Sequence, residues 1–136
     1  MSDQELKAAR QHAFTGLPYE ETFGYCRAIR IGDRVIASGS SALGRDGAMD
    51  PKLKGDMYGQ AKAALAKIED ALNQLGVTLD HAVRTCFYVV DPSQQEQAAQ
   101  VHGEVFAKAK PAFTMVGVPF LYGDDLLIEI EVEAIA

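Results

Sequence analysis

The sequence has little of what would place it in several common protein classes. It has only two cysteines, Cys26 and Cys86, and neither belongs to a CxxC pair, so neither a disulfide framework nor a zinc or redox motif is indicated. No stretch approaches the roughly 20 apolar residues of a membrane helix. The acidic start of the chain is not followed by the apolar run of a secretory signal. We therefore expect a cytoplasmic protein that makes no membrane contact and holds no metal.

Positive charge is also scarce. Lysine and arginine total 13 against 19 aspartates and glutamates, which gives a formal net charge of −6. Because nucleic-acid backbones bind to basic surfaces, this balance argues against nucleic acid as a partner. What remains is an ordinary globular mixture, 48% hydrophobic and 24% charged over 136 residues, which fits one domain over residues 1–136 with one core.

The apolar pattern predicts an α+β fold. Residues 1–21 are polar and form an N-terminal arm or a first strand, and the glycine-rich residues 40–55 form a loop with room for one short strand. The other expected elements are strands over 25–31 and 34–38, a helix over 56–75, a strand over 82–90, a helix from about Asp91 to Pro111, and strands over 113–118 and 126–135.

Turn and cap residues support these boundaries. Gly32-Asp33 suits a two-residue hairpin turn, and Gly76 is a natural helix stop. Two caps compete at the second helix: Ser93 with Glu96 fits a capping box, and Asp91 before Pro92 is the rival. Its expected apolar face comprises Ala98, Val101, Val105 and Ala109.

Two helices can cover only one face of a single mixed sheet. The other face would stay open in a monomer, and several of its side chains should be apolar. Oligomerisation is the simplest way to bury such a face, so we expect more than one copy of the chain in the working protein.

The final strand alternates strictly between apolar and acidic residues. Glu129, Glu131 and Glu133 point one way, and carboxylates two apart on a strand lie roughly 6.5–7 Å from one another. Such a cluster raises its own pKa values and can supply a general acid or base. Spacing alone favours the simpler interpretation, a solvated strand face.

Other candidates are weaker. Tyr25 and Gly39 are expected at the same open end of the hairpin, where a phenol and a backbone N–H could bind a polar ligand; a packed tyrosine and a turn glycine are the alternative. Arg84 is expected either to pair with one of the strand glutamates or to contact solvent. Both cysteines are expected to be packed thiols. The three histidines lack metal-ligand spacing and are expected at the surface or rim, His102 among them.

Several segments together resemble the Rid family (YjgF/RidA, endoribonuclease L-PSP-like). They are the hairpin from Gly24 to Gly39 with its Ser-Gly ending, the helix ending in Leu-Gly, the strand Val83-Arg-Thr-Cys-Phe-Tyr-Val-Val-Asp91, Pro111-Ala-Phe-Thr-Met-Val116 and Glu131-Val-Glu-Ala-Ile-Ala136. The likeness covers roughly residues 22–136 in the family's order.

The resemblance implies a chorismate-mutase-like fold in a homotrimeric barrel, with small-molecule sites in the clefts between subunits and no cofactor. Active members hydrolyse 2-imino acids or enamines. By position, Glu131 matches the glutamate that helps water add, Tyr25 a pocket tyrosine, Gly39 a backbone donor, and Met115 a pocket-lining cysteine.

Phe113 departs from the family pattern. It stands where active members have an arginine that binds the substrate carboxylate, and a phenyl ring cannot replace that charge-assisted contact. Arg27 and Arg84 are the candidate substitutes for anion binding. The resemblance therefore predicts either a hydrolase with altered specificity or a non-catalytic ligand-binding or regulatory trimer. An RNA-cleaving or translation-inhibiting role is disfavoured by the negative charge.

Overall fold

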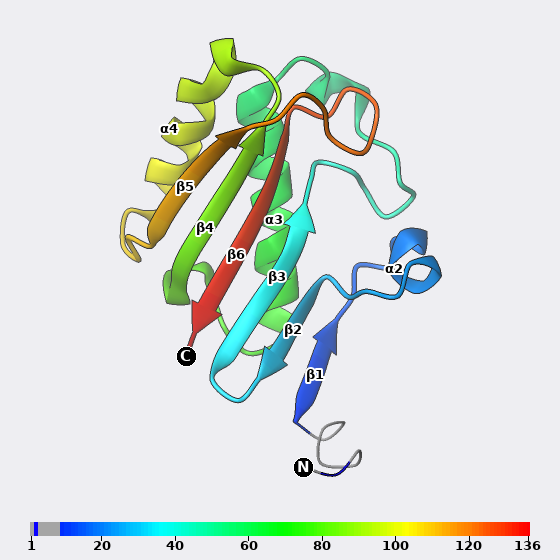
Figure 1. Ribbon diagram of the computed structural model, residues 1–136, viewed down its shortest axis with the longest axis vertical. Helices are drawn as coiled ribbons and strands as arrows, with labels where there is room; N and C mark the ends of the chain where they lie inside the picture. Colours follow the sequence, from blue (N-terminus) through cyan, green and yellow to red (C-terminus); the bar gives the residue numbers. More distant parts are fainter. Residues whose placement is uncertain (1, 3–8) are drawn as a thin grey trace.

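Six strands form one mixed sheet in the computed structural model, which describes residue 2 and residues 9–136. The elements in chain order are β1 (Arg10–Ala13), α2 (Pro18–Thr22), β2 (Ala28–Ile31), β3 (Arg34–Ser40), the 3₁₀ turn η1 (Pro51–Leu53), α3 (Met57–Gln74), η2 (Leu79–His81), β4 (Ala82–Val89), η3 (Pro92–Gln94), α4 (Gln95–Phe106), β5 (Ala112–Gly117) and β6 (Ile128–Ile135). The strand order across the sheet is β1-β2-β3-β6-β4-β5 (Figure 1). The predicted α+β class is confirmed.

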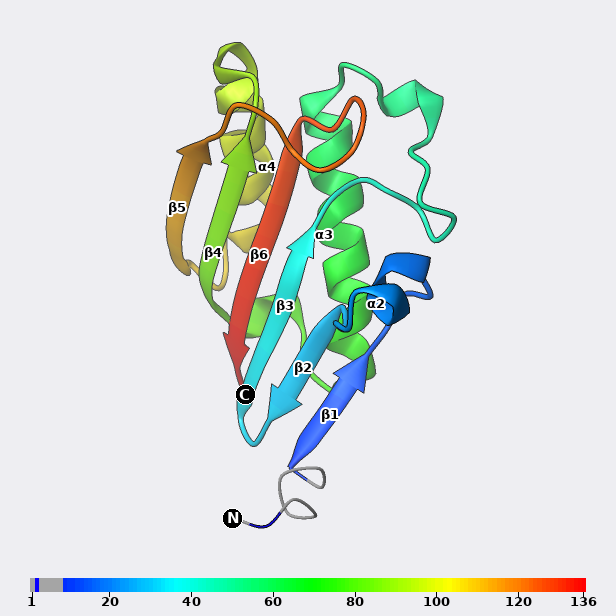
Figure 2. The same ribbon diagram turned by 45° about the vertical axis from the view of Figure 1, so that its right-hand side comes forward.

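The two long helices, α3 and α4, lie on the same face of the sheet (Figure 2). β4 and β5 are parallel and are joined through α4, whereas the other neighbouring strands are antiparallel. The opposite face carries apolar side chains that remain partly or largely exposed, such as Ile29, Ile31 and Ile36. The prediction of an open, partly apolar sheet face is therefore confirmed for the single chain.

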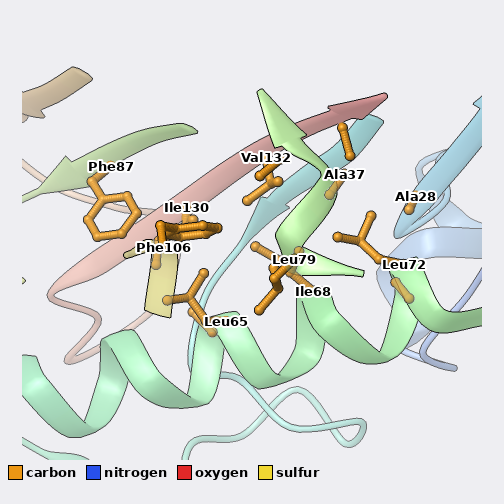
Figure 3. Close-up of a cluster of buried hydrophobic side chains, with 14 of the residues drawn as sticks. Ala28, Ala37, Leu65, Ile68, Leu72, Leu79, Phe87, Phe106, Ile130 and Val132 are labelled. Atoms are coloured by element: carbon orange, nitrogen blue, oxygen red, sulfur yellow. The ribbon is translucent and has the colours of Figure 1, made fainter. Parts of the chain in front are cut away.

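The core lies between this sheet and α3 (Figure 3). The three- and four-residue apolar spacing places Leu65, Ile68 and Leu72 on one side of the helix, beneath the sheet. Alternation along β6 buries Ile130 and Val132 against them, with 0% and 1% of their surface exposed. The same alternation turns the β6 glutamates to the open face, as predicted.

The first hairpin differs from the predicted one at its start. β2 begins at Ala28 rather than at residue 25, because the preceding residues leave the short helix α2. Gly24 has φ +73°, and the Tyr25 N–H donates to the Glu20 carbonyl at 2.9 Å. The helix itself was not predicted, although Pro18 at its first position is a recognised start signal.

The last strand also starts later than predicted. The fully buried side chain of Gln60 binds the backbone just before it: Oε1 accepts from the Leu127 N–H at 2.8 Å, and Nε2 donates to the Asp125 carbonyl at 3.0 Å. Nε2 also donates to the Leu53 carbonyl at 2.9 Å. These bonds occupy the backbone groups that a longer β6 would need, and they join its loop to the α3 start.

Asp91, not Ser93, provides the cap before the second helix. Its Oδ1 accepts from the Ser93 N–H at 3.0 Å and from the Ser93 hydroxyl at 2.7 Å, so the predicted capping box with Glu96 is wrong. The helix ends at Phe106, earlier than expected, and Lys110 beyond it has φ +48°.

The two irregular segments also have definite structures. The loop over residues 40–55, all of them described, holds the turn η1 but none of the short strand allowed for it. β1 occupies part of the N-terminal segment where an arm or first strand was predicted; residues 1 and 3–8 of that segment lie outside the described residues.

Candidate functional site

The acidic face of β6 contributes to a small cavity on the open side of the sheet. Glu129 and Glu131 line it together with Gly39 and Tyr88, and its volume is about 270 Å³. Its remaining walls are apolar: Val118, Phe120 and Leu121. Of the residues proposed from the sequence, the fold thus brings Glu131 and Gly39 to one place.

Tyr88 was missed in the sequence analysis. It lies opposite Glu129 in the β4–β6 register, and Cys86 lies opposite Glu131. A hydrogen bond from the phenol to the Glu131 carboxylate raises the pKa of Tyr88, and a second one with Cys86 adds to it. The phenol therefore keeps its proton and donates it in a hydrogen bond to Glu131. The sequence signal for Tyr88 was its place two residues after Cys86. This spacing puts both side chains on the face of β4 that lies beside the β6 glutamates.

Glu129 is half-buried beside the Gly39 backbone. A Cβ atom built on Gly39 would lie 2.6 Å from Glu129 Oε1, so glycine is needed here for the carboxylate to take this position. Burial raises the pKa of Glu129; Arg27 and Lys67 oppose that rise, and the neighbouring Glu131 adds to it.

Arg27 supports this cavity from behind and is not available as an anion ligand on its surface. Its guanidinium is 2% exposed and donates to the Gly39 carbonyl at 2.8 Å and to the Ser40 hydroxyl at 3.0 Å. It also forms a buried ion pair with Glu20 at 3.3 Å. These contacts fix the strand backbone at Gly39.

Arg84, the other candidate for anion binding, lies exposed on β4 opposite Glu133. Of the two alternatives predicted for Arg84, the structure shows solvent contact and not an ion pair, because Arg34 at the hairpin turn pairs with Glu133 instead. Within residues 9–136, Arg84 forms no ion pair.

Phe113 and Met115 lie elsewhere, at the edge strand β5. They line a separate pocket of about 570 Å³ beside the start of α4. Their register partners on β4 are Thr85 and Phe87, which face the helices. Glu131 pairs with Cys86, which lies between Thr85 and Phe87 on β4. Glu131 therefore faces the side of the sheet opposite to Phe113 and Met115.

His102 determines how the Phe113 ring lies. The two rings stack with centroids 3.9 Å apart and planes 14° apart, and Phe87 contacts Phe113 edge-on at 5.1 Å. His102 is buried, hydrogen-bonded to the Thr85 hydroxyl at 2.8 Å, and burial lowers its pKa. Its predicted place at the surface or rim is wrong; the i, i+4 spacing with Phe106 and Ala98 was the signal of a buried face.

Tyr25 lines a third hollow, of about 760 Å³, together with His12, Phe14 and Ser38. Its ring packs against the Arg27 guanidinium, 5.5 Å from centroid to carbon. One copy of the chain therefore distributes the proposed site residues over three separate surfaces.

Comparison with known proteins places the fold in a family. A family model described as endoribonuclease L-PSP matches residues 19–136. The chain belongs to this family. The Rid/YjgF resemblance inferred from the hairpin and C-terminal segments is confirmed.

Relatives and solved structures agree with that assignment. An uncharacterised protein of Streptomyces coelicolor is 31% identical over 88% of this chain and 87% of its own length, and a RutC family protein of Pyrococcus abyssi is 30% identical over 94% and 97%. A YjgF/YER057c/UK114 family structure from Mycobacterium tuberculosis, Rv2704, has a TM-score of 0.83 at 37% identity, covering 93% of this chain and 99% of that one. A Rid family protein of unknown function from Yersinia pestis, YyfA, has a TM-score of 0.81 at 26% identity, covering 94% and 100%.

The described residues contain neither a membrane-spanning helix nor a metal-binding cluster. None of the helices in the described part of the chain has the length and apolarity to cross a bilayer. Across residue 2 and residues 9–136, histidine, cysteine and acidic side chains form no group of three or more that could hold a metal ion, the β6 glutamates included.

Proposed function

We propose that the protein binds a small molecule in clefts between the subunits of a homotrimer and hydrolyses an imine or enamine there. Glu131 is the proposed base. The observation that supports this most directly is the opposite orientation of Glu131 and Phe113 across the sheet. Only a second copy, placing its β5 edge against the cavity of the first, can unite them.

In the proposed reaction, Glu131 takes a proton from water as the water oxygen adds to the C=N carbon and the nitrogen gains a proton. The resulting carbinolamine then loses ammonia and leaves a carbonyl product. The Tyr88 phenol donates a hydrogen bond to Glu131, and both side chains line the cavity where the water would add. No step of this reaction needs a cofactor or metal. The cytoplasmic location and the absence of nucleic acid as a partner remain predictions.

Phe113 alters the expected substrate. Its stacked ring gives the cleft an apolar wall where active family members bind a carboxylate. Losing charge-assisted hydrogen bonds of about 1.5–3 kcal/mol each would weaken 2-imino acid binding strongly. We therefore expect low activity on 2-iminobutanoate and 2-iminopropanoate, and higher activity on a substrate without the carboxylate.

The test is ammonia release from enzymatically generated 2-iminobutanoate, from its carboxamide analogue, and from an enamine, with Glu131→Ala as the inactive control. We expect Glu131-dependent release from the uncharged compounds. A correctly folded trimer that releases no ammonia from any of them, yet is thermally stabilised by one, would replace this proposal with a ligand-binding or regulatory role.

The trimer is tested separately by light scattering at micromolar concentration. A stable monomer would leave Glu131 and Phe113 on opposite faces of the only copy present, and the proposed cleft would be lost.

A further inference from the structure

A second carboxylate faces the same cavity as Glu131. Glu129 lies two residues before it on β6, so the two Cα atoms are about 7 Å apart, and both side chains line the cavity with Gly39 and Tyr88. We propose that Glu129 binds and protonates the substrate nitrogen while Glu131 activates water, and that the substrate is therefore an imine or enamine without a carboxylate. This inference rests on the function proposed above.

The two carboxylates have different surroundings, which suits them to different roles. Glu131 accepts the hydrogen bond of the Tyr88 phenol, which raises the pKa of that phenol. Glu129 is half-buried against the Gly39 backbone, and no group in the described part of the chain donates a hydrogen bond to it. Pairs of carboxyl groups whose environments differ in this way commonly divide into an acid and a base.

Three charged groups act on Glu129, and together they do not outweigh its burial. Arg27 and Lys67 favour the ionised form, but Arg27 is already paired with Glu20, and Lys67 donates to the Leu43 carbonyl at 3.0 Å. Glu131 disfavours a second negative charge in the same cavity. The protonated form of Glu129 therefore persists to a higher pH than that of an exposed glutamate.

The residues that line the cavity favour a ligand that carries no negative charge. The lining residues comprise two carboxylates, a phenol, a backbone glycine and three apolar side chains, with no basic side chain among them. A ligand carboxylate would meet two acidic side chains without a compensating cation in the cavity lining, whereas a nitrogen that gains a proton would be attracted. Phe120, 74% exposed in the single chain, adds an aromatic wall.

The proton transfers balance with these two groups. Glu129 gives its proton to the imine nitrogen as the water oxygen bonds to the imine carbon and Glu131 accepts a water proton, which gives a neutral carbinolamine. Glu131 then passes its proton to the amino nitrogen, the C–N bond breaks and ammonia leaves, while the Glu129 carboxylate accepts the hydroxyl proton and the oxygen becomes the carbonyl. Both carboxyl groups return to their starting states, so the net change is imine plus water to ketone plus ammonia.

The test compares Glu129→Gln with Glu133→Gln, the matched control from the same strand face. Glu133 pairs with Arg34 and lies outside the cavity. We expect Glu129→Gln to lower ammonia release from the carboxamide analogue by roughly 10²-fold or more, the range for a general acid, and to abolish the fall in rate at alkaline pH. Glu133→Gln should stay within about twofold of wild type, a factor well below that range.

Ligand binding provides a measurement that does not depend on turnover. Benzamidine, a planar cation that imitates a protonated imine, should raise the melting temperature more than isosteric benzoate does. Glu129→Gln should remove that preference and Glu133→Gln should keep it. Gly39→Ala, whose methyl group displaces the Glu129 carboxylate, should behave like Glu129→Gln and serves as the second variant.

The possible outcomes separate the two proposals. Full activity in Glu129→Gln would overturn this inference and leave Glu131-dependent hydrolysis standing. Glu129-dependent benzamidine binding without turnover of any imine would support the nitrogen-binding carboxyl and refute hydrolysis. Benzoate binding as tightly as benzamidine, or no benzamidine binding, would overturn the inference.

Discussion

Removing the Arg27 charge tests whether the buried Arg27 contacts hold the backbone at Gly39 in place. Arg27 and Glu20 are 2% and 3% exposed, and Arg27 also donates to the Gly39 carbonyl and the Ser40 hydroxyl. In an Arg27→Met variant, Glu20 would keep only its two hydrogen bonds from Thr15. Breaking a buried pair in this way costs about 3–5 kcal/mol of unfolding free energy, a large share of the 5–15 kcal/mol typical of a domain.

Urea unfolding followed by far-ultraviolet circular dichroism, at one fixed protein concentration, measures this change. With a slope of about 2 kcal/mol per molar urea, the midpoint should fall by about 1.5–2.5 M. The matched control is Arg34→Met, which removes the exposed pair with Glu133, 57% and 24% exposed, and should cost about 0–1 kcal/mol.

A double variant with Glu20 also replaced by methionine should be more stable than Arg27→Met alone, because the uncompensated carboxylate is gone. If Arg27→Met loses no more stability than Arg34→Met, the buried pair does not hold the hairpin end together and the account of Gly39 is wrong.

Three further predictions follow from buried contacts. Gln60→Leu leaves the Leu53 and Asp125 carbonyls and the Leu127 N–H without their partner. It should lower the unfolding free energy by about 2–5 kcal/mol in the same urea assay. The control Gln74→Leu, whose amide contacts are exposed, should change the unfolding free energy by less than about 1 kcal/mol. Because burial lowers the pKa of His102, the stability that depends on its neutral form is complete above about pH 6.5 and is lost as the pH falls through the lower, folded-state pKa. Melting temperatures from about pH 8 to pH 5 should therefore fall less in His102→Gln than in wild type, and equal slopes in the two proteins would contradict this. Phe113→Arg should add a carboxylate-binding group and raise ammonia release from 2-iminobutanoate at least about tenfold, the effect of one recovered charge-assisted hydrogen bond; no increase in a folded trimer would show that the position does not bind substrate.

Periodicity in the sequence was sufficient for most of the fold. The α3 stripe and the β6 alternation each give one consistent apolar face, so the positions of Ile68, Leu72, Ile130 and Val132 in the core followed from spacing. Boundaries that depend on a distant partner did not follow. Gln60 shortens β6 from 67 residues away, and the Glu20 carbonyl ends the turn before β2, contacts that no local pattern contains.

The candidate site divides in the same way. The sequence by itself determined that Glu129, Glu131 and Glu133 share one face of a strand, because this depends only on their order along the chain. That Phe113 stands in place of the family's arginine stays a prediction from the resemblance. Only the tertiary structure decided that Arg27 is buried behind Gly39, that Arg34 rather than Arg84 pairs with Glu133, and that Tyr88 bonds to Glu131. Strand register sets which side chains meet across a sheet, and register depends on contacts between segments far apart in the chain.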